Sequence, residues 1–225
     1  MTPPIDIRYQ DDHLVVVAKP GGMLVHRDAH SRTFEPLLLN VVRDQIGTYL
    51  YPVHRLDRNT SGLVAFALSS EMAKALQERL QDDDAIKEYD VLVRGTTPET
   101  FASDRPLRDA NGEPRPCLTE FRTVRHFDRS SLVVARLRTG RYHQIRRHLN
   151  HLGHHVLGDT THGKGRDNQY YRDHFSLPRM FLHAYRLEFR HPRSDEPLRL
   201  HDPLHDDLKA VLNQLIARQQ SSATD

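Results

Sequence analysis

Short apolar runs alternate with polar, turn-forming segments along much of the chain, a pattern that predicts β-strands. Two such runs, 7–9 and 14–18, flank Asp11-Asp12 and predict a hairpin. The unbroken apolar run 63–68 predicts a buried strand. Further strands are predicted at 89–94, 119–125, 132–137, 182–190 and 198–200.

Apolar residues at helical spacing predict four helices. Segment 69–71 supplies a serine N-cap and an acidic first turn for one of them. Others are predicted at 37–47, at 143–152 with Gly153 as C-cap, and from Asp202-Pro203 onward. The apolar stripes of the three longer helices are Met72, Leu76 and Leu80; Ile145, Leu149 and Leu152; and Leu208, Val211, Leu212, Leu215 and Ile216.

Strands outnumber helices, and most connections suit hairpins or meanders rather than β-helix-β crossovers. We therefore predict an α+β fold with a mixed, largely antiparallel central β-sheet flanked by helices. The sequence shows no internal repeat and no flexible linker. A single domain over residues 1–218 is expected, followed by a disordered tail, 219–225.

Composition points to a soluble globular protein, with 37% hydrophobic and 28% charged residues. No apolar run approaches the ~18 residues that span a bilayer, and the N-terminus lacks the pattern of a signal peptide. Cys117 is the only cysteine, which excludes an intramolecular disulfide and a multi-cysteine zinc site. We expect a cytoplasmic protein that does not associate with membranes.

Charge is unevenly distributed along the chain. Residues 1–135 hold 17 Lys and Arg against 20 Asp and Glu, whereas residues 136–200 hold 13 against 6 and nine of the sixteen histidines. A local cationic excess is what a polyanion binder needs, because phosphate contacts supply most sequence-independent affinity. A solvated basic face would have the same composition. Charge therefore suggests RNA or DNA without choosing between them.

One candidate for chemistry is Asp57, in a polar turn that leads directly into the predicted strand from Leu63. Arg55 and Arg58 flank it, and nearby cations favour an ionised carboxylate that acts as a nucleophile or base. Segment 60–62 allows a tight turn that would fix its direction. The alternative is a structural salt bridge at the start of a strand.

Two more segments carry candidate side chains. Tyr89 follows Lys87 on a predicted strand, where an inward tyrosine is either a core residue or a site residue. Segment 137–148 ends a strand at Thr139-Gly140 and begins a helix whose first turns hold two arginines and two histidines. Such a helix start suits a phosphate or a carboxylate, although it could equally be an exposed basic helix.

These segments resemble, in order and separation, the signatures of the RluA-type pseudouridine synthases. The strings are His-Arg-Leu-Asp-x-x-Thr-Ser-Gly at 54–62, Lys-x-Tyr at 87–89 and Thr-Gly-Arg-x-His-Gln-Ile-Arg at 139–146. Minor marks of the family agree: Lys19-Pro20, Val25-His26, Gly158-Asp159, His162-Gly163 and Leu182-His183-Ala184. Ala18 departs from the Asn or Asp frequent at that position. Short length and segment 42–47 make the chain similar to the tRNA pseudouridine synthase C group of this family.

The resemblance implies the pseudouridine synthase catalytic fold, with two halves meeting at a central RNA-binding cleft. It implies isomerisation of a specific uridine in structured RNA, namely uridine 65 in the T-stem of tRNA, with no cofactor. Asp57 would be the essential carboxylate, Arg146 its ion-pair partner with Arg141 as second choice, and Tyr89 would lie against the uracil. The residues expected to bind RNA are His54, Arg55, Arg58, Thr60, Arg141, His143, Gln144 and Arg147.

Three routes for Asp57 stay open: attack at C1′ of the sugar, addition to C6 of the base, or removal of the 2′ proton. We expect a monomer that binds RNA, most specifically tRNA, and that needs no metal. His148, His151, His154 and His155 have ligand-like spacing, but Gly153 should end their helix and no carboxylate lies near them in sequence. Rival functions are the same reaction on large-subunit ribosomal RNA, a non-catalytic RNA-binding module and a metal-dependent hydrolase.

Overall fold

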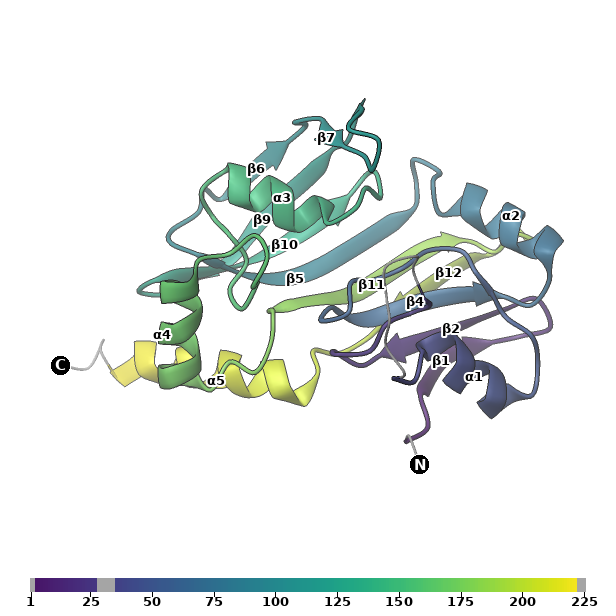
Figure 1. Ribbon diagram of the computed structural model, residues 1–225, viewed down its shortest axis with the longest axis horizontal. Coiled ribbons are helices and arrows are strands. Elements are labelled where there is room, and N and C mark those ends of the chain that lie inside the picture. The colour runs from purple at the N-terminus through teal and green to yellow at the C-terminus, as the bar shows by residue number, and fades with distance from the viewer. Residues whose placement is uncertain (1–2, 28–34, 222–225) are drawn as a thin grey trace. The chain divides into compact units, whose positions relative to one another are not determined.

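The computed structural model describes residues 3–27 and 35–221, which fall into two compact units (Figure 1). The first comprises the chain up to Lys87 together with Ala184–Pro203. The second comprises Glu88–His183 and the chain from Leu204 onward. The predicted fold class, a largely antiparallel sheet with flanking helices, is confirmed.

Strand β4 lies at the centre of the first unit, between β2 and β11. Its seven residues are all buried, which explains the unbroken apolar run in the sequence. β1 pairs with β2, β3 with β4 and β12 with β11, each antiparallel. The elements are β1 (Asp6–Gln10), β2 (Leu14–Lys19), α1 (Leu38–Ile46), β3 (Tyr51–Pro52), β4 (Ser61–Ala67), α2 (Ser70–Arg79), β11 (Leu182–Arg190) and β12 (Pro197–His201).

Helix α2 begins where the sequence predicts. The side chain of Ser69 accepts a hydrogen bond from the backbone N–H of Met72 at 3.1 Å, and Glu71 lies in the first turn. Leu76 and Leu80 pack with residues of β2 and β4 in one apolar cluster. This core holds β4 in place, and with it the polar loop that precedes the strand.

The second unit contains an antiparallel meander in the order β5-β10-β9-β6. Its core joins apolar residues of β5 and β10 to those of α4 and α5. Its elements are β5 (Ile86–Arg94, which begins in the first unit), β6 (Thr100–Ser103), β7 (Leu107–Arg108), β8 (Pro114–Arg115), β9 (Thr119–His126), β10 (Ser130–Leu137), α3 (Gln144–His151), α4 (Gly165–Phe175) and α5 (Asp206–Ser221). The small hairpin β7–β8 and helix α4 were not predicted, since both are mostly polar.

The last helix differs from the prediction at both ends. It begins at Asp206 rather than at Asp202, because the N–H of Asp202 donates to Tyr185 O at 2.8 Å and keeps that residue beside β11. It also continues through Gln219, which we placed in a disordered tail. The amide of Gln219 donates to His126 O at 3.0 Å, so this turn of the helix is attached to β9.

One stripe residue of α3 was also predicted wrongly. Ile145 and Leu149 are buried as expected, but Leu152 is 40% exposed. The helix ends at His151, so Leu152 is its C-cap and no longer lies on the inward face. Gly153 follows with a φ of 81°, the left-handed conformation expected of a residue that ends a helix.

Candidate functional site

Asp57 lies in the loop between β3 and β4, and backbone hydrogen bonds hold this loop. The N–H of Thr60 donates to the backbone carbonyl oxygen of Asp57 at 3.0 Å, which closes the turn that begins with Asp57. The N–H of Gly22 donates to Arg58 O at 2.8 Å and ties the turn to the segment after β2. Leu56 anchors the loop in the core with 4% exposure. The side chain of Asp57 is thus carried by an ordered backbone.

Lys19 holds the same loop through hydrogen bonds from its side chain. Its side chain is fully buried, and its ammonium donates to Pro20 O at 2.8 Å, Met23 O at 2.7 Å and Arg58 O at 3.0 Å. A buried ammonium needs such partners, since an unpaired charge in the interior is costly. Lys19 therefore acts as a positioning residue for the residue next to Asp57. In the sequence, Lys19 was noted only as part of the minor family mark Lys19-Pro20.

Replacing Lys19 by Met should loosen this loop. The variant loses three charge-assisted hydrogen bonds and leaves carbonyl oxygens without their donor, so we expect a loss of about 2–4 kcal/mol in the free energy of unfolding. Urea denaturation measures this value. Lys74, on the neighbouring helix α2, offers a control: Lys74→Met should change stability by less than about 0.5 kcal/mol. Equal effects of the two changes would contradict the role given to Lys19.

The second residue of β4, Gly62, must be glycine. Gly62 has a φ of 113°, and a Cβ built on it would lie 2.2 Å from Ala184 O on β11. Both the conformation and the close approach exclude a larger residue. Beside it, the hydroxyl of Thr60 is buried and has no hydrogen-bond partner among the described residues. Gly62 and Ala184 belong to two separate family marks, and the approach of Gly62 to the backbone of Ala184 explains why residue 62 has no side chain.

The arginines that flank Asp57 in sequence do not share one role. The guanidinium of Arg58 donates to Gly22 O at 2.9 Å and pairs with Glu35 at 2.5 Å. It therefore forms its ion pair with a different carboxylate, and the expectation that Arg58 helps to keep Asp57 ionised stays a prediction. The side chain is exposed, so a contact with RNA remains a prediction. Arg55 is exposed as well.

His54 is a structural residue of this segment. Its Nε2 accepts a hydrogen bond from the N–H of Ala65 on β4 at 2.9 Å, which requires a neutral ring. Burial, together with the nearby charge of Lys87, lowers the pKa of His54 to about 4. Burial also lowers the pKa of Lys87, whose ammonium donates to Leu80 O at 2.6 Å. Two family motifs, at 54–62 and at 87–89, thus meet through these side chains.

Acid should destabilise the protein through His54. The folded pKa of about 4 lies below the ordinary value of 6.5, so the stabilisation exists above pH 6.5 and is lost as the pH falls towards 4. Between pH 7.5 and 4.5, protonation linked to this group should lower the free energy of unfolding by about 2–3 kcal/mol. His54→Gln keeps a hydrogen-bond acceptor but does not titrate. Urea denaturation should therefore show a smaller loss for this variant, and equal losses would refute the assignment.

Tyr89 and Arg146 belong to the second unit. Tyr89 lies on β5 opposite Ala135 of β10 and is 9% exposed. Arg146 lies on α3 and is buried. Its Nε donates to Asp159 Oδ2 at 2.7 Å and its Nη2 to Asp159 Oδ1 at 2.8 Å, a two-pronged ion pair. Sequence reasoning noted Gly158-Asp159 as a family mark but did not identify Asp159 as a partner of Arg146.

Asp159 also shapes the turn that follows it. Its Oδ1 accepts hydrogen bonds from the N–H groups of Thr161 at 2.8 Å and His162 at 3.0 Å. Burial opposes ionisation of this carboxyl, but the bonds from Arg146 and from these backbone groups hold its pKa below the ordinary value. Arg146 is therefore fixed in orientation before any substrate binds.

Gln144 organises the loop before α3. Its Oε1 accepts from the hydroxyl of Thr139 at 2.8 Å and from the N–H of Arg141 at 2.9 Å. Its Nε2 donates to Leu118 O at 3.0 Å and to the hydroxyl of Thr119 at 2.9 Å. Because all these bonds are internal, the buried Gln144 is explained as a positioning residue rather than as an RNA contact.

The structure thus assigns Asp57 to the first unit and Tyr89 and Arg146 to the second. Their joint action stays a prediction. The sequence singled out the segments that carry them, namely the loop of Asp57, strand β5 and helix α3. Lys19, which holds the loop of Asp57, and Asp159, which pairs with Arg146, were noted only as parts of minor family marks.

Comparison with known proteins decides the family. A family model described as RNA pseudouridylate synthase matches residues 13–151, more than half of the chain. The chain belongs to the RNA pseudouridylate synthase family. The matched part includes Asp57, Tyr89 and Arg146, so the resemblance drawn from the motifs is confirmed.

Curated relatives agree over most of their length. The chain is 37% identical to "tRNA pseudouridine synthase C" of Vibrio cholerae, over 93% of this chain and 95% of the relative. It is also 37% identical to the protein of that name from Salmonella typhi, over 93% of this chain and 89% of the relative.

Two solved structures share the fold of this family member. One is "Human RNA Pseudouridylate Synthase Domain Containing 4", with a TM-score of 0.77, 23% identity and coverage of 94% of this chain and 93% of that chain. The other is "Human RNA Pseudouridylate Synthase Domain Containing 1", with a TM-score of 0.73, 24% identity and 98% coverage of both chains.

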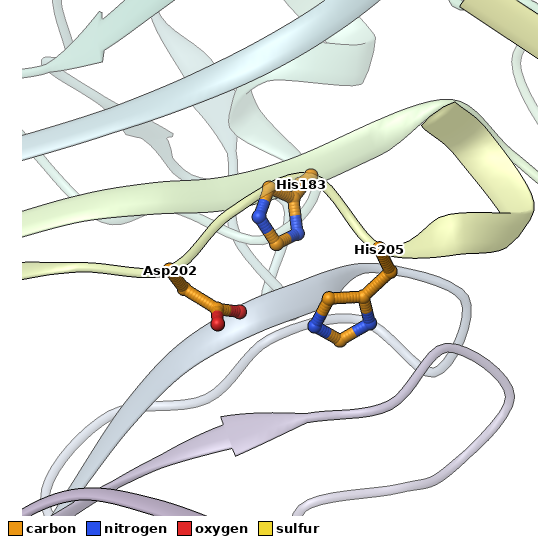
Figure 2. Close-up of side chains that lie close together, drawn as sticks. All are labelled: His183, Asp202 and His205. Carbon is orange, nitrogen blue, oxygen red and sulfur yellow. The ribbon is translucent and has the colours of Figure 1, made fainter. Parts of the chain in front are cut away.

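One group of side chains in this pseudouridylate synthase has ligand atoms close enough for a metal. His183, Asp202 and His205 lie within 4.8 Å of one another (Figure 2). However, the guanidinium of Arg8 donates to Asp202 Oδ1 from Nε at 3.0 Å and from Nη2 at 2.6 Å. The positive charge of Arg8 would repel a bound cation. The group therefore fits a buried polar cluster better than a metal site.

Two of the four histidines that we weighed as ligands, His148 and His155, have other partners. His148 contacts the hydroxyl of Thr119 at 2.9 Å, and burial lowers its pKa. His155 contacts Asp167 at 3.1 Å. Among the residues that the structure describes, these histidines are not gathered into a set of metal ligands. None of the described helices is long and apolar enough to cross a membrane.

Proposed function

We propose that this chain is a tRNA pseudouridine synthase that isomerises uridine 65 in the T-stem, with Asp57 as the essential carboxylate. The observation that carries the proposal is the 37% identity, over nearly the full length of both chains, to relatives named tRNA pseudouridine synthase C. The ordered loop around Asp57 supports the catalytic part, because a reacting group must be held in a defined direction.

The proposed reaction is an internal rearrangement. The bond between C1′ and N1 of the uracil breaks, a bond between C1′ and C5 forms, the proton on C5 is lost, and N1 gains a proton. Nothing is oxidised or reduced and no group leaves, so the residues alone can carry the reaction. Asp57 attacks C1′ or C6, or removes the 2′ proton. Arg146 compensates its charge, and the ring of Tyr89 holds the detached base.

We further propose that the target uridine is flipped out of its helix, at a cost of a few kcal/mol. The cationic stretch 136–200 offsets this cost by binding the flanking phosphates. Arg55, which is exposed, is the better candidate to fill the gap in the base stack. His54 is less suited to this role because its ring is bonded to Ala65.

The test is incubation of the purified chain with unmodified transcripts of tRNA and of large-subunit ribosomal RNA, followed by carbodiimide mapping of pseudouridine. New pseudouridine at position 65 of tRNA alone is expected. Modification of the ribosomal fragments alone would replace the proposed substrate with the rival one. RNA binding without any new pseudouridine would instead indicate a non-catalytic binding module.

A further inference from the structure

An aromatic pair, Tyr142 and His143, lies at the start of α3, and Tyr142 was not among the residues expected to bind RNA. The side chain of Tyr142 is 65% exposed, which is unusual for a large aromatic residue. Its ring is stacked on that of His143, with centroids 3.7 Å apart and 21° between the planes. One face of the tyrosine is covered by this contact, so the exposed area is concentrated on the rest of the ring.

The pair is rigidly supported. His143 has a φ of 52°, and its Nδ1 lies 3.0 Å from Nε2 of His162. His162 in turn belongs to the turn fixed by Asp159, the partner of Arg146. A chain of contacts therefore connects the exposed ring to a buried ion pair, and the ring loses little conformational freedom when something binds to it.

The surroundings of the ring are cationic. The guanidinium of Arg147 donates to Tyr142 O at 3.4 Å and to Arg108 O at 3.1 Å. That of Arg141 donates to Pro116 O at 3.3 Å. Both arginines are bonded to backbone carbonyls, and within the described part of the chain neither forms an ion pair with a carboxylate. Their positive charges therefore remain available to an anionic partner.

We propose that Tyr142, backed by His143, is a stacking platform for an unpaired base of the substrate RNA, with Arg141 and Arg147 holding the phosphates beside it. A flat ring among uncompensated guanidinium groups suits a nucleotide, because every base has a π-face and every nucleotide carries a phosphate. The inference rests on the proposed function for its choice of RNA. It adds a positioning residue that takes no part in the chemical step.

The test uses the full chain and an unmodified tRNA transcript, with Kd measured by fluorescence anisotropy. Tyr142→Leu keeps an apolar side chain but removes the ring, and it should weaken binding about tenfold. Tyr142→Phe keeps the ring and should bind like the wild type. Tyr49 is a matched control, because it is 64% exposed and packs edge-on against Tyr51. Tyr49→Leu should leave Kd unchanged.

Salt dependence separates stacking from charge. Tyr142→Leu should leave the slope of log Kd against log salt unchanged. Arg147→Gln should lower this slope by about 1, which is the contribution of one phosphate contact. In steady-state assays Tyr142→Leu should raise KM and leave kcat near the wild-type value. If Tyr142 had a structural role, Tyr142→Leu would lower the thermal stability of the protein. We expect this variant to unfold at the same temperature as the wild type.

The outcomes distinguish this inference from the proposed function. Wild-type activity on tRNA combined with unchanged binding by Tyr142→Leu would overturn the platform alone, as would equal weakening by Tyr142→Leu and Tyr142→Phe. Weaker binding by Tyr142→Leu, with no pseudouridine formed by the wild type, would support the platform and overturn the proposed function. A wild-type chain that binds no RNA would overturn both.

Discussion

Asp57→Asn should reduce pseudouridine formation at least about 10³-fold under single-turnover conditions. Asn has nearly the same shape as Asp but carries no charge, so it cannot attack C1′ or C6 and cannot accept the 2′ proton. Each of the three routes is therefore blocked by the same change. The measurement is the rate of pseudouridine formation in unmodified tRNA with enzyme in excess, followed by carbodiimide mapping.

The fold and the affinity for RNA should survive this substitution, because backbone hydrogen bonds and the ammonium of Lys19 hold the loop, whatever the charge of residue 57. Asp44→Asn is a suitable control, since Asp44 is an exposed residue of α1 that pairs with its neighbour Arg43. It should retain wild-type activity. If Asp57→Asn modified tRNA at even a tenth of the wild-type rate, another residue would have to supply the essential carboxylate.

Arg146→Met should lower the free energy of unfolding by about 3–5 kcal/mol, because it leaves the carboxylate of Asp159 buried without its cation. Removing one member of a buried ion pair costs more than the pair contributes as a whole. Urea denaturation, followed by circular dichroism, measures the change. Turnover at a temperature where the variant is folded would then test the separate proposal that Arg146 acts beside Asp57.

Two further variants make this prediction specific. Arg138 forms an ion pair with Glu120 at the surface, and Arg138→Met should cost less than about 1 kcal/mol. Adding Asp159→Asn to Arg146→Met should recover part of the loss, because Asn removes the stranded charge but keeps an oxygen for the N–H groups of Thr161 and His162. Equal costs at Arg146 and Arg138 would show that burial of the pair has no energetic consequence.

Local patterns in the sequence were reliable where a single interaction decides the structure. The apolar run at β4 forms a central strand because both of its faces are buried. Ser69 caps α2 because its hydroxyl reaches a backbone N–H three residues later. Predictions failed where a distant residue decides the outcome. Asp202 stays outside α5 through Tyr185, and Gln219 stays helical through its bond to His126.

The sequence by itself determined the family, the fold class and the identity of the candidate carboxylate, because motifs and periodicity are local properties of the chain. Only the tertiary structure showed that Lys19 supports the loop of Asp57, that Asp159 pairs with Arg146 and that Gly62 meets the backbone of Ala184. Lys19 and Arg58, like Gly62 and Ala184, are far apart in sequence. Their contacts arise from strand pairing and burial, which a pattern read along the chain cannot specify.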